Sequence, residues 1–366
     1  MKRVNNLFDS LISDENLLKA IEEVNRTHHW KHGHKPNKTT AWVEMTKEKR
    51  VKDLRNIILN GFQQNPPKIV NRYDVSAKKW RTISEPAQWP DQYIHHALVQ
   101  VLQPVMMRGM DKYCCGSIKG RGTHYAKHAI EVWMKTDAAG TKYCLCMDIR
   151  HFYDNLNPVI VMLRLKHLIK DYRILNVAWR VVCRGIKIGA YPSQWFANTT
   201  LQPLDVLIRQ SGLCNHYVRY MDNITIFGSN IYKLRQLKYK VEHWLNTIYL
   251  QVKGDWQIYS TDKRLPNAVG YRYGRDYVLP RKNNLLRLKR ALSRYRRRVQ
   301  NGEQVSLNLA LSILSRLGQL KHCNNYSLYK SLFKGERIFR NLKKIANKSR
   351  SSIMTWDTYM TSLSTT

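Results

Sequence analysis

HYVRYMDNITIFG, residues 216–228, has the pattern of two strands joined by a tight polar turn. Asp and Asn suit such turns because their side chains bond the nearby backbone and tolerate left-handed conformations. The alternative is that Asp222 stands at the tip of the hairpin in order to bind a ligand. The stretch alone favours neither interpretation, and the rest of the chain decides between them.

The charge balance points to a polyanionic partner. The 366 residues include 62 Lys and Arg against 26 Asp and Glu, a net charge of +36, and 43% are hydrophobic. Such a chain can bury a large core in two or three subdomains, so the excess charge decorates a folded surface. RNA or DNA is the favoured partner. A membrane surface ranks second, but the sequence has no apolar run of about 18 residues, so we expect no membrane partner.

The cysteines and the N-terminal stretch indicate the compartment. The seven cysteines form no CxxC pair and their number is odd, which fits a reducing cytoplasm better than a disulfide scaffold. The stretch MKRVNNLFDSLISDENLLKA has acids in its middle and no secretory apolar region. We therefore expect a cytoplasmic protein.

A second acid ends a strand-like segment upstream. In residues 142–156, KYCLCMDIRHFYDNL, the short apolar run typical of a buried strand ends in Asp148. An acid there is costly unless it is paired or coordinates a metal. Carboxylates that converge on divalent cations form the two-metal arrangement for in-line phosphoryl transfer, and Mg²⁺ suits oxygen ligands. Together with Asp222 and the charge of +36, Asp148 favours a nucleic-acid polymerase over a simple turn.

Two other stretches raise the question of a metal site. Cys144 and Cys146 share a face of the same strand, where small buried hydrophobic residues are a simpler interpretation than a thiolate site. HHWKHGHKPNK, residues 28–38, is rich in His, but neither Cys nor carboxylate joins the histidines locally. A solvated or RNA-facing loop is therefore favoured there.

Six motifs in order resemble those of reverse transcriptases, and they span roughly residues 70–275. The block IGAYPSQ, followed by WFANTTLQPLD, is particularly similar to the reverse transcriptases of diversity-generating retroelements. Those enzymes have Ile/Val/Leu-Gly-x-x-x-Ser-Gln where most reverse transcriptases have Gln-Gly-x-x-x-Ser-Pro. Prokaryotic defence-associated reverse transcriptases share the same core and are the close alternative. The motifs are RTISEP (81–86), GRGTH (120–124), CMDIRHFYD (146–154), IGAYPSQWFAN (188–198), YMDN (220–223) and VGYRYG (269–274).

The resemblance implies an α+β right-hand polymerase with an antiparallel palm sheet and helical N-terminal and thumb regions. It implies RNA-directed DNA synthesis with two Mg²⁺ ions, for which Mn²⁺ can substitute. The implied partners are dNTPs, a structured non-coding template RNA, the cDNA product, and an accessory protein or second subunit. The expected parts are a helical basic N-terminal extension (1–66), fingers (67–140), palm with part of the fingers (141–275), thumb (276–348) and a polar tail (349–366).

Asp148 and Asp222 are the metal ligands that the resemblance implies, with the Ile149 carbonyl as a third contributor. The family usually has two acids at the hairpin tip, and here the second catalytic position is Asn223. Asn coordinates a cation through its carbonyl oxygen but supplies no charge. Three interpretations remain: an active natural variant, an engineered substitution that traps a complex, and a catalytically silent partner in a non-catalytic RNA-binding scaffold.

The resemblance also implies sites for the nucleotide and the primer. Tyr153 matches the aromatic steric gate that excludes a ribose 2′-hydroxyl, and ordinary palm packing is its alternative. Gly270 and Tyr271 match the turn that grips the primer end. The implied dNTP-binding residues are Lys79, Arg81, Arg121, Tyr153, Ser193 and Gln194.

A basic segment beyond residue 280 is the thumb candidate. Residues 281–298, RKNNLLRLKRALSRYRRR, carry nine Lys and Arg and no acid. A solvated face is the simpler interpretation of a charge run, but this one repels itself unless a polyanion lies opposite, which favours template–primer contact. The expected contacts are Arg287, Lys289, Arg290, Arg294 and Arg297, and the expected packing stripe is Leu285, Leu286, Leu288 and Leu292.

Further elements follow from periodicity and turn residues. The pattern predicts helices over 47–62, 91–108 and 306–322, and a helical hairpin over 323–348. It also predicts a β-hairpin over 68–83, whose turn carries Lys78, Lys79 and Arg81.

Overall fold

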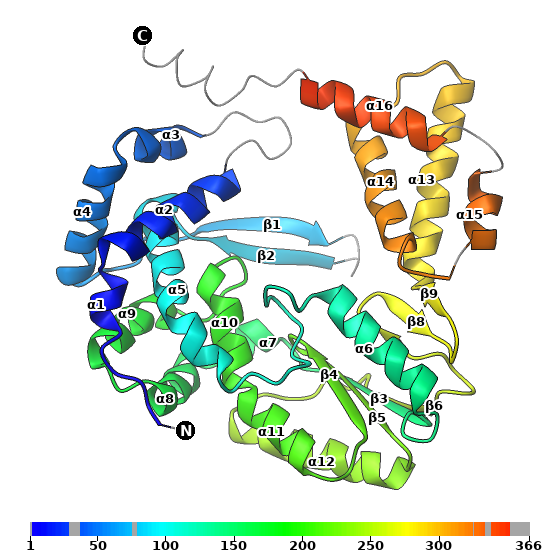
Figure 1. Ribbon diagram of the computed structural model, residues 1–366, viewed down its shortest axis with the longest axis horizontal. Coiled ribbons are helices and arrows are strands. Elements are labelled where there is room, and N and C mark those ends of the chain that lie inside the picture. Colours follow the sequence, from blue (N-terminus) through cyan, green and yellow to red (C-terminus); the bar gives the residue numbers. More distant parts are fainter. Residues whose placement is uncertain (1, 29–36, 75–78, 325, 334–337, 352–366) are drawn as a thin grey trace.

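A computed structural model of the chain describes residues 2–28, 37–74, 79–324, 326–333 and 338–351. Helices and antiparallel sheets alternate along it, which confirms the expected α+β class. Figure 1 shows the N-terminal helices and a two-stranded ribbon on one side, a larger sheet below, and a separate group of helices on the other side. The His-rich stretch over 29–36, Lys78 and the tail beyond 351 lie outside the described residues.

The central element is a four-stranded antiparallel sheet with the strand order β4-β5-β3-β6. Tyr220 pairs with Asn223, so Met221 and Asp222 form a two-residue turn, with Met221 at φ 56°. Asp148 pairs with Asn223 from the other side. The predicted hairpin is confirmed, and its tip meets the end of the upstream strand. The strands are β3 (Tyr143–Asp148), β4 (His216–Tyr220), β5 (Asn223–Gly228) and β6 (Gln257–Ser260).

The two faces of this sheet pack against different partners, because side chains alternate along a strand. Leu145 and Met147 face the main core, together with helix α12 (Ile231–Thr247) and its neighbour α11 (Gln202–Gln210). Cys144 and Cys146 face the opposite side and a second core. That core includes α6 (Thr123–Thr136) and a small sheet of β7 (Asn267–Ala268), β8 (Tyr271–Tyr273) and β9 (Val278–Pro280). Asp148 continues this second face by the same alternation.

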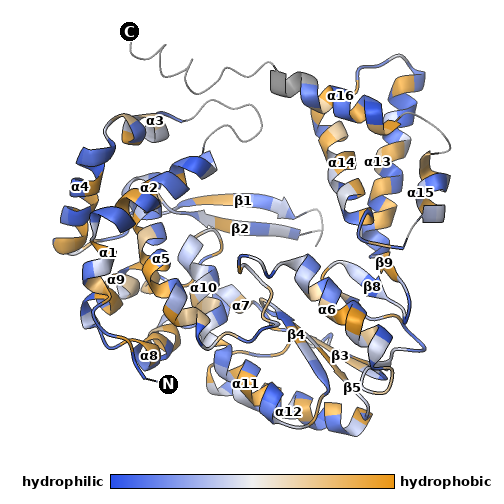
Figure 2. Cartoon of the chain, viewed as in Figure 1, coloured by the Kyte–Doolittle hydropathy of each residue, from blue (hydrophilic) through white to orange (hydrophobic). Residues whose placement is uncertain are grey.

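Helix α5 (Tyr93–Met107) is buried along most of its length and confirms the helix predicted over 91–108. Figure 2 shows it as largely hydrophobic. Helix α5 directly follows a short π-helical turn, η2 (Gln88–Gln92). No helix within the described ranges is long and apolar enough to cross a membrane. The helices gathered around α5 are α1 (Phe8–Leu11), α2 (Asp14–His28), α4 (Lys47–Leu59), α9 (Tyr172–Val182) and α10 (Tyr191–Thr200), with α3 (Lys38–Met45) and α8 (Pro158–Leu168) beside them.

The ribbon consists of β1 (Lys68–Asp74) and β2 (Lys79–Glu85), which confirms the hairpin predicted over 68–83. The prediction that its turn carries Lys79 and Arg81 is wrong, because the antiparallel ladder continues to the Asp74–Lys79 pair and both cations lie within β2. The ribbon is tied to the 188–190 segment, since the Ser84 amide donates to the Ile188 carbonyl at 2.7 Å.

The C-terminal helices, which include the thumb candidate, have their own core, in which Leu288 and Leu292 are buried. They confirm the helices predicted over 306–322 and 323–348 within the described residues, and a further helix covers the basic segment over 281–298. The expected packing stripe is wrong at Leu286, which is 50% exposed. Positions two apart lie on different sides of a helix, so Leu286 and Leu288 cannot share a face. The helices are α13 (Lys282–Gln300), α14 (Leu307–Leu320), α15 (Tyr326–Phe333) and α16 (Ile338–Ser351).

Gly116 lies directly against the hairpin turn of the central sheet. A Cβ at this position would lie 2.6 Å from the Met221 side chain and 2.7 Å from its backbone nitrogen. The Gly116 carbonyl also accepts a hydrogen bond from the Asn198 side chain at 2.8 Å. Only a residue without a side chain fits here, so Gly116 forms one wall of the turn.

We predict that Gly116→Ala lowers the free energy of unfolding by about 1–3 kcal/mol, because an extra carbon in a filled site displaces its neighbours. Urea denaturation followed by circular dichroism measures this. Gly122→Ala is the matched control, since a Cβ at Gly122 has nothing within 4 Å. Equal unfolding free energies for the two variants would contradict the prediction.

Candidate active site

The end of β3 and the β4–β5 turn bring two carboxylates and one amide together. The Ile149 amide donates to the Asp222 carbonyl at 3.2 Å, which joins the two segments through the backbone. The Asn223 side-chain nitrogen donates to a carboxylate oxygen of Asp148 at 2.9 Å. The residues that the sequence assigned to a metal site therefore lie in one place.

The electrostatics of the acidic pair favour a cation. Burial raises the pKa of Asp148 to about 6, and the negative charge of Asp222 adds to the increase. Burial likewise raises the pKa of Asp222, and the charges of Arg81 and Lys79 partly offset the increase. Two half-buried carboxylates with raised pKa values are stabilised in their ionised form when a divalent cation lies between them. Carboxylate and amide oxygens are also the ligands that Mg²⁺ prefers.

Other metal sites have less support. Among the described residues, no group of three or more His, Cys, Asp or Glu side chains is arranged to hold a metal. Cys144 and Cys146 do share a face, with their sulfurs 3.6 Å apart, but Cys144 is fully buried in an apolar core. The simpler interpretation, that these are small buried hydrophobic residues, fits this environment.

The ribbon of β1 and β2 carries cations whose charges act on the acidic pair. Arg81 is bound to Asp74 through its Nε at 2.7 Å, and its side chain is 40% exposed. The charges of Arg81 and Lys79 both lower the pKa of the Asp222 carboxyl. The guanidinium of Arg121 donates to the Asp111 carbonyl at 2.9 Å.

The remaining candidate nucleotide residues come from two helices. Tyr153, on α7 (Phe152–Asn155), packs against the main core, and burial together with the charge of Asp222 raises the pKa of its phenol. Ser193 and Gln194 lie in the first turn of α10, where Ser193 is buried and Gln194 is exposed. Gln194 lines a cavity of 910 Å³ that also reaches Arg72 of the ribbon and His96 of α5.

The turn over 268–270 lies beside the β4–β5 hairpin. Gly270 has φ 91°, and its carbonyl accepts hydrogen bonds from the Arg281 amide at 3.0 Å and the Gln319 side chain at 3.2 Å. A cavity of 160 Å³ is lined by Gly270, Arg281, Tyr220 and Asn223. Gly270 therefore faces the hairpin tip, whereas the neighbouring Tyr271 is 2% exposed and packs in the second core.

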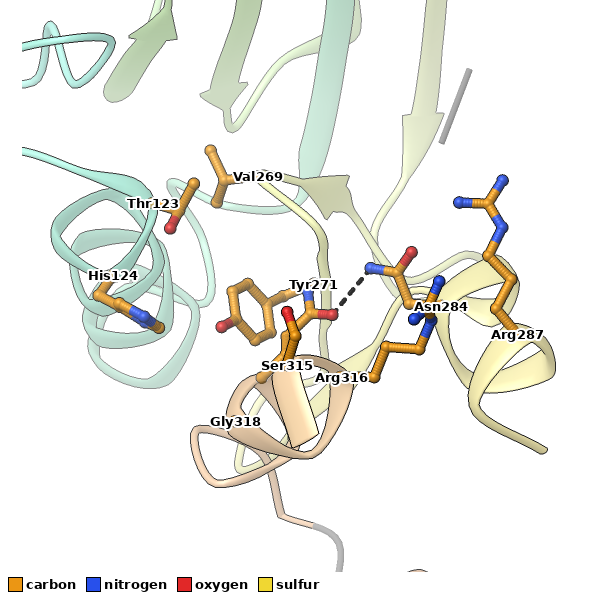
Figure 3. A pocket seen from close by; sticks show the side chains of 10 residues that line it. Thr123, His124, Val269, Tyr271, Asn284, Arg287, Ser315, Arg316 and Gly318 are labelled. Atoms are coloured by element: carbon orange, nitrogen blue, oxygen red, sulfur yellow. Dashed lines mark hydrogen bonds between the residues drawn. The ribbon is translucent and has the colours of Figure 1, made fainter. Parts of the chain in front are cut away.

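A larger cavity of 520 Å³ separates the start of α6 from the thumb. Figure 3 shows His124 of α6 on one side of it and Arg287 and Arg316 of the thumb on the other. Burial lowers the pKa of Arg316, and the positive charges of Arg287 and Arg294 lower it further. Arg287 and Arg316 thus line this cavity, and Arg294 lies close enough for its charge to act on Arg316.

The thumb cations occupy both flanks of α13. Helical spacing places Arg287, Arg290, Arg294 and Arg297 on the flank that adjoins Arg316, and it places Lys289 on the opposite flank of the buried stripe. The sequence grouped all five as one contact surface. The structure divides them, because 3.6 residues per turn rotate Lys289 away from the other four.

The comparisons with known proteins decide the family. The family model of the reverse transcriptases (RNA-dependent DNA polymerases) matches residues 67–255, which is more than half of the chain. The chain belongs to this family. The family match and the observed elements confirm the expected right-hand fold. No curated protein matches the chain.

Several solved telomerase structures have a similar arrangement. Telomerase from Candida albicans in complex with a TWJ fragment of telomeric RNA is 12% identical, with a TM-score of 0.45, and the match covers 84% of this chain and 64% of that one. Apo telomerase from Candida tropicalis truncated from its C-terminal domain is 14% identical, with a TM-score of 0.44 and coverages of 66% and 60%. Full apo telomerase from Candida tropicalis is 10% identical, with a TM-score of 0.43 and coverages of 93% and 75%. The chain thus spans less than two thirds of the first two telomerase chains.

A buried ion pair behind the hairpin of this reverse transcriptase was not found from the sequence. Arg219 and Asp205 are 0% and 1% exposed, and two of the Arg219 nitrogens donate to the Asp205 carboxylate, each at 2.7 Å. The third guanidinium nitrogen donates to the Asn198 side chain at 2.8 Å and to the Met221 carbonyl at 3.1 Å. The pair therefore holds the backbone carbonyl that directly precedes Asp222.

Lys253 is a second residue of the reverse transcriptase site that the sequence did not indicate. Its amide donates to the Asp148 carbonyl at 2.8 Å, and its ammonium group binds Asp255 at 2.6 Å. The bond to Asp255 raises the pKa of Lys253, and the charges of Asp148 and Asp222 add to the increase. No local pattern distinguishes this cation in so basic a chain.

We predict that Asp205→Ala in this reverse transcriptase lowers the free energy of unfolding by about 3–5 kcal/mol, because it leaves Arg219 buried without a counter-charge. Chemical denaturation measures the loss. Glu23→Ala serves as the control, since it removes an exposed partner of Arg26 and should cost less than about 1 kcal/mol. A cost for Asp205→Ala no greater than that of the control would show that the pair does not hold the hairpin.

Proposed function

We propose that this reverse transcriptase makes cDNA from a structured RNA within a diversity-generating retroelement, by two-metal-ion nucleotidyl transfer. The observation that carries the chemistry is the convergence of Asp148 and Asp222, joined by the Ile149 amide. The block IGAYPSQ over 188–194 supports the retroelement, because it departs from the usual reverse transcriptase pattern at its final Gln. In the structure this block connects the ribbon to α10.

Asp148, Asp222 and the Ile149 carbonyl are the groups that would hold the metal ions. When bound there, two Mg²⁺ ions supply activation of the primer 3′-hydroxyl and stabilisation of the triphosphate and leaving pyrophosphate. Asn223 adds a neutral ligand. Its amide nitrogen now faces Asp148, and a half rotation of the amide presents the oxygen instead.

The other residues of the site bind and select the nucleotide. Arg81 and Lys79 neutralise the triphosphate from the fingers, in keeping with their action on Asp222. Tyr153 excludes the ribose 2′-hydroxyl with its ring, and Gly270 allows the primer end to approach the hairpin tip. The seven free cysteines are consistent with a reducing cytoplasm, where we place the reaction, with an accessory protein or second subunit as a further partner.

A non-catalytic RNA-binding scaffold is the second candidate. The observation that favours it is the bond from the Asn223 nitrogen to Asp148. The family usually has a second acid at this position, and the uncharged amide leaves the site with one negative charge fewer. A defence role is compatible with the same polymerase core, and the genomic neighbourhood separates it from the retroelement. A repeat pair of template and variable sequences beside the gene indicates a retroelement.

We predict that Asp148→Ala and Asp222→Ala each abolish templated DNA synthesis while leaving RNA binding nearly unchanged, because the carboxylates hold the metal ions and do not contact the template. Primer extension with labelled dNTPs and Mg²⁺ is the measurement. Asn223→Asp should preserve or raise the rate, because it adds a negative charge to the metal site. Full synthesis by Asp148→Ala would refute the metal assignment, and absence of any templated product from the unchanged protein would favour the scaffold.

We predict that the joint change of Arg290, Arg294 and Arg297 to Gln reduces the salt dependence of template–primer binding. Each lost phosphate contact lowers the slope of log affinity against log salt by about 0.9, because fewer counterions are released. Affinity measured over a range of NaCl concentrations gives the slope. Lys289→Gln is the control, because it removes a charge from the opposite flank of α13. It should leave the slope of log affinity against log salt unchanged. An unchanged slope in the triple variant would place the duplex elsewhere.

A further inference from the structure

The outer face of α12 is a basic and aromatic surface that the polymerase reaction does not use. Tyr232 and Tyr239 are 69% and 65% exposed, and they lie seven residues apart on the same side of the helix. Gln236 and His243 complete the central stripe, and both are exposed. We call these residues, with the exposed cations that flank them, the α12 face. The flanking cations are Lys233, Arg235 and Lys240.

Helix α12 is amphipathic, with an apolar inner side and the α12 face on its outer side. The opposite side of the helix buries Leu234, Leu237, Val241 and Leu245 in the main core. Cations lie over both tyrosine rings: Arg235 is 5.9 Å from the centroid of Tyr232, and the Lys238 nitrogen is 4.7 Å from that of Tyr239. Hydrophobic packing therefore accounts for the inner side only.

Negative charge on this helix is already paired. Glu242 is the one acid in the α12 sequence, and it binds Lys238 at 2.7 Å. The α12 face thus presents π surfaces and positive charge together. This combination suits single-stranded nucleic acid, whose bases stack on aromatic rings and whose phosphates attract cations.

The α12 face is separated from the active site by the central sheet. α12 packs on the side of the sheet that carries Leu145 and Met147, whereas Asp148 lies at the end of the other side. In Figure 1, α12 lies below the sheet, with the ribbon and the thumb above it. A template–primer duplex held between fingers and thumb therefore leaves the α12 face free for a second contact.

We propose that the α12 face binds a single-stranded segment of RNA while the active site holds template and primer. Bases stack on Tyr232 and Tyr239, which lie about 10 Å apart along the helix axis at 1.5 Å per residue. Lys233, Arg235 and Lys240 contact the phosphates. The proposal rests on the proposed function in one respect, that the RNA is a non-template part of the structured RNA being copied.

The test uses the full-length protein saturated with a template–primer hairpin that ends in a dideoxynucleotide. A fluorescein-labelled, unstructured RNA of about 20 nucleotides, long enough for one single-strand site, is then titrated by fluorescence anisotropy. The unchanged protein should bind this RNA with the active site occupied. The double variant Tyr232→Ala/Tyr239→Ala should bind it about tenfold more weakly or worse, since two stacking rings are lost.

Matched variants separate stacking from other causes. Tyr232→Phe/Tyr239→Phe keeps both rings and should retain the affinity. Tyr172→Ala removes another tyrosine, 78% exposed on α9, and should have no effect. Changing Lys233, Arg235 and Lys240 to Gln should lower the salt slope by about 0.7 for each lost phosphate contact. Failure of the RNA to bind the saturated protein, or wild-type affinity in the double Ala variant, overturns the proposal and directs the search to a protein partner for this face.

The proposed function is tested separately from this surface. Primer extension on a short extendable duplex should proceed at the same rate in all α12 variants, because that duplex occupies the opposite side of the sheet. Anisotropy does not require synthesis. A protein that makes no DNA but binds the labelled RNA through Tyr232 and Tyr239 would therefore refute the polymerase proposal and uphold the α12 face.

Discussion

The buried ion pair of Arg219 and Asp205 is the interaction on which the β4–β5 hairpin depends. Two charges withdrawn from water cost several kcal/mol each in order-of-magnitude terms unless nearly every polar group finds a partner. Here the Tyr217 hydroxyl also donates to Asp205 at 2.6 Å, and Asn198 and the Met221 carbonyl accept the remaining Arg219 hydrogens. Because the charged groups of this pair are hydrogen-bonded on all these sides, the pair fixes one position of the turn. Few other positions of the turn would preserve all these bonds.

The ion pair fixes the position of Asp222 through the backbone. Arg219 fixes the carbonyl of Met221, Gly116 fixes its nitrogen and side chain by close approach, and Asp222 follows directly. Asp222 and Asp148 are then held near each other although the charge of Asp222 disfavours ionisation of Asp148. The rest of the fold supplies the free energy that keeps this unfavourable pair together, and carboxylates with raised pKa values are common at functional sites.

The hairpin and the convergence of two acids were predictable because they rest on local patterns. Apolar alternation defines the strands, and an acid at the end of an apolar strand is unusual enough to indicate chemistry. The Arg219–Asp205 pair was not predictable, because its partners come from a strand and a helix and nothing local reveals their burial. The error at Lys79 and Arg81 has a similar cause: cations look like turn residues in sequence, whereas the ladder with β1 decides where the strand begins. Helix α12 was not predicted at all, since its exposed tyrosines obscure the apolar stripe.

The distribution of the positive charge follows from the two faces of the central sheet. In the proposed reaction, a duplex and a triphosphate bring negative charge to the face of the sheet that carries Asp148, and the cations of the thumb flank and of β2 neutralise it. The cations of α12 lie on the other side of the same sheet, away from these proposed substrates. A chain with a net charge of +36 repels itself on both sides unless each is neutralised. A long structured RNA that passes around the edge of the palm neutralises both at once, whereas a short template neutralises only the first.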